Sequence, residues 1–112
     1  MYKDRKMTVS RLCEKLLLTA YNHEEDRAVK GVFCCDLLSV AMAKAPEGFA
    51  WVTIIGNANT VAVATLTDVA CIVLAEGFTF DAAAVNAAKG KIALFGSDKP
   101  VYETAVSIGN LL

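Results

Sequence analysis

The sequence predicts a single α/β domain over residues 1–112, in which helices cover both faces of a mostly parallel sheet to give three layers. Three observations predict it. The chain has the length of one ordinary domain. Hydrophobic residues make up 55% of it and charged residues 21%, enough apolar surface to offset the entropy of ordering a core. Short apolar runs alternate with helical patterns along most of the chain, as in right-handed β-α-β units.

The amino-terminal part is predicted to form one helix and two short strands. Thr8 is a suitable N-cap for the helix, and Met7 can pack against Leu12 as a hydrophobic staple. Leu16–Tyr21 is apolar enough for a short strand, which a polar turn follows. We expect the second strand at Val29–Cys35.

Strands then pass directly into helices. Asp36 is a good N-cap for a helix at Leu37–Ala45. The next unit has a strand at Ala50–Ile55, a turn at Gly56–Asn59 and a helix at Thr60–Ala70. The continuous apolar run Cys71–Ala75 is typical of a central parallel strand. The last elements are a helix at Ala82–Lys89, capped by Thr79 or Asp81, a strand at Ile92–Phe95, and a helix that has Pro100 near its first position.

Composition excludes several classes of function. The net charge of -1 gives no general attraction for nucleic acid or anionic lipid. Gly48–Thr67 is uncharged and long enough to span a membrane, but polar residues at its middle favour a strand, a loop and a helix instead. The basic amino end, Met1–Met7, precedes no apolar segment of signal-peptide length. We therefore expect a cytoplasmic protein with no membrane and no nucleic-acid partner.

The four cysteines fit reduced thiols in the cytoplasm better than disulfides. Cys34 and Cys35 are adjacent in a predicted strand, so they point to opposite faces and cannot hold one metal together. With His23 as the only histidine, we expect no metal, no cofactor and no histidine-based triad. A thiol enzyme using Cys34 or Cys35 is the weakest hypothesis, because neither has a base nearby in sequence.

Ligands of open parallel sheets bind beyond the carboxyl ends of the strands, where this chain places several polar residues. The turn after the third strand could present free amides to an anion, although its residues also serve simply to make the turn and cap the helix. No phosphate-loop, dinucleotide or nucleophile-elbow motif occurs, so no catalytic residues are predicted. The candidate ligand residues are Asp36, Gly56, Asn57, Asn59, Thr60 and Ser97.

The most informative motif is Asp26-Arg27-Ala28-Val29-Lys30-Gly31, followed by Asp36-Leu37-Leu38-Ser39. On residue chemistry alone, Asp26 and Arg27 can fix a turn, and Gly31 permits close packing at a strand start. The motif resembles the signature of the DRTGG domain, a module similar to the amino-terminal domain of HPr kinase/phosphorylase. Lys30 and Val32 stand where that signature has threonine and its second glycine.

The resemblance implies the same α/β fold, with Asp26, Arg27, Lys30, Gly31 and Asp36 as signature residues. It also implies a regulatory or interaction module without chemistry of its own. The excess of apolar residues favours a homodimer, and a protein partner encoded nearby is possible. The alternative is a sensor that binds a nucleotide or another phosphate-bearing metabolite at the carboxyl ends of the strands.

Overall fold

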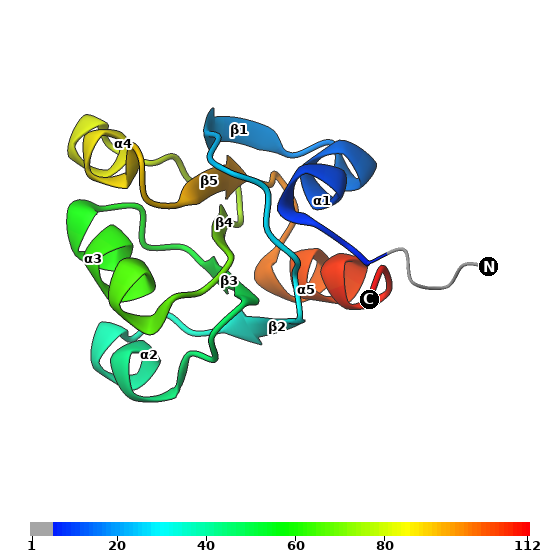
Figure 1. Ribbon diagram of the computed structural model, residues 1–112, viewed down its shortest axis with the longest axis horizontal. Coiled ribbons are helices and arrows are strands. Elements are labelled where there is room, and N and C mark those ends of the chain that lie inside the picture. Colours follow the sequence, from blue (N-terminus) through cyan, green and yellow to red (C-terminus); the bar gives the residue numbers. More distant parts are fainter. Residues whose placement is uncertain (1–5) are drawn as a thin grey trace.

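The computed structural model describes residues 6–112 and arranges them in three layers (Figure 1). A five-stranded sheet has the order β1-β5-β4-β3-β2. Strands β2 to β5 run parallel, and β1 is antiparallel to β5. Helices α2, α3 and α4 cover one face, and α1 and α5 cover the other. The predicted α/β class is confirmed, while Lys3 and Arg5 of the basic amino end lie outside the described residues.

The bounds of the elements follow the predicted alternation closely. In chain order they are α1 (Val9–Leu16), β1 (Thr19–Asn22), β2 (Gly31–Cys34), α2 (Leu38–Lys44), β3 (Phe49–Thr53), α3 (Ala58–Thr67), β4 (Cys71–Leu74), α4 (Ala82–Ala88), β5 (Ala93–Gly96) and α5 (Val101–Gly109).

The beginning of the first predicted strand was wrong. Thr8 caps α1 as predicted, with its side chain accepting a hydrogen bond from the Arg11 amide. The helix continues to Leu16, however, and Leu17 ends it in the left-handed conformation at φ 53°. Strand β1 therefore starts only at Thr19. Apolar composition alone could not separate the last turn of the helix from the strand.

The helix caps also differ in part from prediction. Asp36 is not the N-cap of α2, since Leu37 occupies that position without a side-chain hydrogen bond. Asn57 caps α3, so this helix starts before the predicted Thr60. Asp81 caps α4. Pro100 is the N-cap of α5, directly before its first residue, which agrees with the predicted place near the start of the helix.

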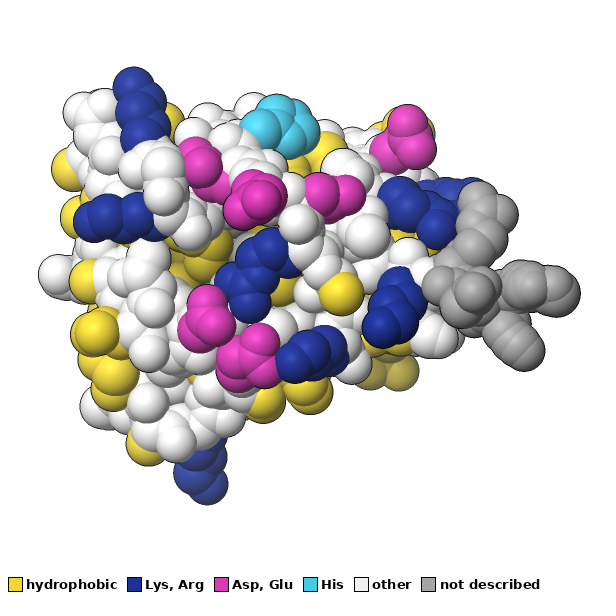
Figure 2. Space-filling model, in the orientation of Figure 1, with side chains coloured by type: hydrophobic (Ala, Val, Ile, Leu, Met, Phe, Trp, Pro, Cys, Tyr) yellow, Lys and Arg dark blue, Asp and Glu magenta, His cyan; other side chains and the backbone are white. Residues whose placement is uncertain are grey.

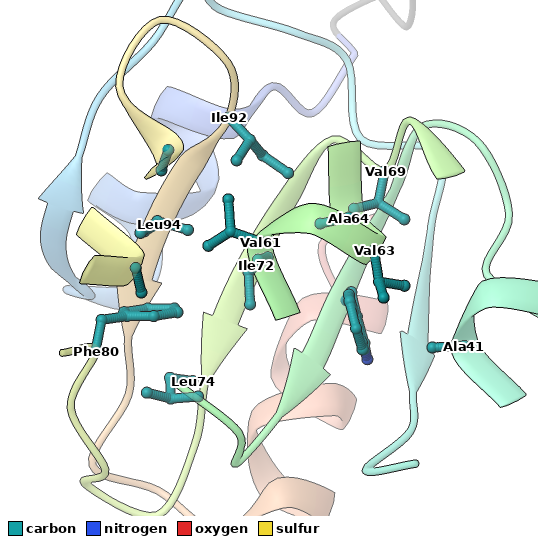
Figure 3. Close-up of a cluster of buried hydrophobic side chains, with 13 residues drawn as sticks. Ala41, Val61, Val63, Ala64, Val69, Ile72, Leu74, Phe80, Ile92 and Leu94 are labelled. Carbon is teal, nitrogen blue, oxygen red and sulfur yellow. The ribbon is translucent and has the colours of Figure 1, made fainter. Parts of the chain in front are cut away.

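The sheet separates two hydrophobic clusters, one beneath each helical layer. Between the sheet and α2 to α4, Ile72 and Leu94 pack against Val61 (Figure 3). On the other face, Phe95 packs in a cluster with Leu12 of α1 and Ile108 of α5. All four residues of β4 are buried, which confirms the central strand that the apolar run predicted.

The uncharged segment that could imitate a membrane span is divided between β3, a turn and α3. Within residues 6–112, no helix is both long and apolar enough to cross a bilayer.

Candidate functional site

The predicted ligand residues lie at the carboxyl ends of the parallel strands, but in two places. Asp36 follows β2, and the turn from Gly56 to Thr60 follows the neighbouring strand β3. Ser97 follows β5, which β4 separates from β3. Five of the six candidates therefore follow the neighbouring strands β2 and β3, and Ser97 lies apart from them.

Asp36 joins the ends of β2 and β3. Its Oδ1 accepts hydrogen bonds from Thr53 Oγ1 at 2.8 Å and from the Ile54 amide at 3.0 Å. Thr53 is fully buried, so Asp36 provides the partner that its hydroxyl needs. The residue that was predicted to start α2 instead holds two strand ends together.

The amides at the start of α3 already have an acceptor. Asn57 Oδ1 accepts from the Asn59 amide at 2.9 Å and from the Thr60 amide at 3.2 Å. The side-chain oxygen therefore occupies the place that an incoming phosphate oxygen would take. Asn59 is exposed, whereas Thr60 is fully buried.

The segment after β4 covers Gly56. A Cβ atom at this glycine would lie 2.7 Å from the Thr79 carbonyl oxygen, and the Gly56 carbonyl accepts from the Asp81 amide at 3.0 Å. This close contact with backbone explains why a residue without a side chain stands here. The chain itself therefore fills the space beside Gly56.

The chain leaves β4 toward α4, on one face of the sheet, and leaves β5 toward α5, on the other face. Such a switch point is where a ligand crevice is expected. Here the two loops bond to each other: the Glu76 amide donates to the Lys99 carbonyl at 2.8 Å, and the Gly77 amide to the Ser97 carbonyl at 3.0 Å. Glu76 Oε2 also accepts from the Val101 amide at 3.0 Å, so this carboxylate caps α5. The spacing of residues in the sequence did not predict that Glu76 caps α5.

Ser97 borders a cavity of about 250 Å³ between α5 and the end of α1. Its hydroxyl lies 3.0 Å from Thr104 Oγ1 and accepts from the Lys99 amide at 3.1 Å. Thr104 in turn donates to the Lys99 carbonyl at 3.2 Å. The hydroxyl pair therefore fixes the loop before α5. The cavity is lined by Leu16, Leu17, Leu18, Ser97, Asp98, Lys99, Thr104 and Ser107.

The other signature residues lie at the opposite, amino end of the strands. Asp26 accepts hydrogen bonds from the amide and hydroxyl of Ser10, at 2.9 and 2.8 Å. Although partial desolvation acts to raise the pKa of Asp26, these bonds hold it below its usual value. Asp26 thus ties the connection before β2 to the first turn of α1.

Arg27 and Lys30 form ion pairs with residues distant in sequence, where acidic and basic side chains mix on the surface (Figure 2). Arg27 Nη1 donates to Asp68 Oδ1 at 3.1 Å and to the Val69 carbonyl at 3.0 Å. Lys30 Nζ lies 2.6 Å from Glu47 Oε1, and this contact lowers the pKa of Glu47. The charged signature residues connect the amino ends of neighbouring strands.

Gly31 faces an aromatic ring at the start of β3. A Cβ atom there would lie 2.5 Å from Phe49 Cζ, which explains the close packing expected at this position. The two adjacent cysteines differ in their surroundings: Cys34 is exposed, and Cys35 packs against the core beneath α2. Desolvation, followed by the charge of Asp36, raises the pKa of the Cys34 thiol, which reduces the reactive thiolate at neutral pH.

Comparison with known proteins returns no relative: no protein-family model matches the chain, and no curated protein matches its sequence.

Proposed function

We propose that the protein is a non-catalytic interaction module, of the regulatory kind that the DRTGG resemblance implies, and that it associates with a second copy of itself in the cytoplasm. One observation carries the proposal: the exposed large hydrophobic side chains are concentrated on two helices. Of the nine found within residues 6–112, six belong to α2, α5 or positions beside them. These are Leu37, Val40, Met42, Tyr102, Val106 and Leu112.

A concentration of apolar side chains favours association, because water is released when a second surface covers them. The strand ends support the same proposal in a different way. Asp36, Asn57 and Glu76 each accept a hydrogen bond from a backbone amide of their own chain. Such bonds make this end of the sheet a stable frame for presenting a surface.

Sedimentation velocity of the purified chain tests the proposal. We expect a dimer at micromolar concentration, in reversible exchange with monomer at higher dilution. A strict monomer throughout the micromolar range would overturn it.

The cavity beside Ser97 favours a second candidate, a sensor for a small phosphate-bearing metabolite. It combines three hydroxyl side chains and Lys99 with an apolar wall, and its volume of about 250 Å³ suits a small ligand. A thermal-shift screen of nucleotides and phosphorylated metabolites tests it, since a ligand of the folded state raises Tm. Ser107→Leu, which fills the cavity from α5, should abolish any shift. A screen that moves nothing overturns the sensor.

A further inference from the structure

The cavity beside Ser97 lies on the face of the sheet that α1 and α5 cover (Figure 1), and a chain of hydrogen bonds forms its polar wall. The Lys99 amide donates to Ser97 Oγ at 3.1 Å, and Thr104 Oγ1 donates to the Lys99 carbonyl at 3.2 Å. The two hydroxyl oxygens are 3.0 Å apart. Because Thr104 has a single hydroxyl proton, all three contacts are hydrogen bonds only when Ser97 donates to Thr104.

This arrangement leaves the two hydroxyl groups as acceptors alone. Both protons are directed to partners within the chain, whereas each hydroxyl oxygen has a second lone pair that these contacts do not use. Ser97 and Thr104 are 9% and 2% exposed, so few water molecules compete for the two protons. A ligand therefore gains hydrogen bonds from this wall by donating to it, and an ionised phosphate oxygen, which only accepts, finds no proton there.

The loop beside these hydroxyls supplies one side chain of each charge. Asp98 and Lys99 both line the cavity and are exposed. Neither forms an ion pair with another side chain within residues 6–112. The Lys99 ammonium can bind a phosphate group as a point charge, and the Asp98 carboxylate is a further acceptor for hydroxyl groups of a ligand. The phosphate of a ligand is therefore expected at the lysine, and its hydroxyl groups at the buried wall.

A second wall of the cavity is apolar and partly open to water. Leu16, Leu17 and Leu18 line it, and Leu17 is 89% exposed, the most of any large hydrophobic side chain within residues 6–112. The carbon atoms of a ligand would cover this side chain and release water from it. The cavity volume of about 250 Å³ lies below the roughly 300–1,000 Å³ of pockets that take drug-sized ligands, which favours a molecule smaller than a nucleotide.

We propose that the cavity binds a small polyol phosphate, that is, a phosphate ester of a short carbon chain that carries free hydroxyl groups. The hydroxyl groups donate to Ser97 and Thr104, the carbon chain packs against the leucine wall, and the phosphate pairs with Lys99. This inference rests on the second candidate function, the sensor of a phosphate-bearing metabolite, and names the class of metabolite that it detects.

A matched pair of ligands tests the hydroxyl wall. Glycerol phosphate and propyl phosphate have the same length of carbon chain and the same phosphate group, and they differ only in the free hydroxyl groups of glycerol. Isothermal titration calorimetry of the wild-type chain should give glycerol phosphate a dissociation constant lower by roughly tenfold or more. Adenosine monophosphate, which is larger, should bind more weakly than glycerol phosphate.

Two substitutions of Thr104 test the direction of the hydrogen-bond chain. Thr104→Val removes one acceptor oxygen and frees the Ser97 proton, so the preference for glycerol phosphate over propyl phosphate should fall by roughly threefold or more. Thr104→Ser keeps a hydroxyl group and should keep the preference. The Lys99 carbonyl remains bonded to the Glu76 amide at 2.8 Å in both variants, which holds the loop in place. Circular dichroism and Tm establish that both variants are folded.

A pair of exposed leucines tests the apolar wall. Leu17 ends α1 in the left-handed conformation at φ 53°, which glycine adopts without strain. Leu17→Gly should therefore raise the dissociation constants of both phosphate esters by roughly threefold or more without lowering Tm. Leu66→Ala, at a 72% exposed position of α3 on the other face of the sheet (Figure 1), should leave both constants unchanged. Unchanged constants in Leu17→Gly would overturn this placement of the carbon chain.

The results separate this inference from the sensor. If none of these compounds binds and no other phosphate ester in the screen raises Tm, both are overturned. If propyl phosphate or adenosine monophosphate binds as tightly as glycerol phosphate, or if Thr104→Val keeps the full preference, the sensor stands and the polyol assignment is overturned. A site that selects glycerol phosphate and loses this preference in Thr104→Val supports both.

Discussion

The two ends of the sheet use polar residues in different ways. At the amino ends, Arg27, Lys30, Glu47 and Asp68 form ion pairs whose side chains keep between 33% and 64% of their surface exposed. At the carboxyl ends, Asp36 and Asn57 accept hydrogen bonds from backbone amides and from the buried Thr53. Exposed ion pairs contribute little, whereas loss of a cap leaves donors without partners. Stability should therefore depend more on the carboxyl end.

The largest difference in stability between the two ends of the sheet is expected when a glycine at each end is replaced by alanine. Gly56→Ala should reduce the free energy of unfolding by about 2 kcal/mol, because the new methyl group meets the Thr79 carbonyl oxygen of the backbone. Gly31→Ala, at the amino end, meets the tip of the Phe49 ring, which can rotate away. Urea denaturation of both variants measures the difference. Equal losses would show that the backbone over Gly56 moves as easily as a side chain.

The next effect concerns the α3 cap. Asn57→Ala should cost about 1 kcal/mol in the free energy of unfolding, since the amides of Asn59 and Thr60 lose their acceptor. Asn57→Asp keeps an acceptor oxygen and should retain the stability. Asn59→Ala, at an exposed position of the same turn, is the control. A loss for Asn59→Ala as large as that for Asn57→Ala would contradict a capping role.

The sequence pattern predicted those features of the fold that depend on residues close together in the chain. The buried run Cys71–Leu74 and the turn after β3 both follow from residue order, and Asn57 lies in the turn whose residues were expected to cap the helix. The role of Asp36 was not predictable in this way, because its partners Thr53 and Ile54 reach it only when β3 lies beside β2. Arg27 is a stronger case, since Asp68 is 41 residues away in sequence.

At the amino end of the sheet, Asp26 should make a contribution to the free energy of unfolding that depends on pH. Its folded-state pKa is lowered, so its stabilisation is complete above the unfolded value of about 3.9 and is lost as the pH falls through the folded value. Asp26→Asn should therefore be less stable than wild type at neutral pH, by less than Asn57→Ala. The difference should shrink in acid. Urea denaturation at both pH values measures it, and Ser10→Ala should weaken the dependence.

The smallest effect is expected for Glu47→Gln, which removes the carboxylate from both Lys30 and Arg27. The pair with Lys30 is short, but both side chains are more than half exposed, so water replaces the interaction when it is lost. Urea denaturation at neutral pH should find no resolvable change. A loss as large as that for Asn57→Ala would show that this exposed pair stabilises the fold more than such pairs usually do.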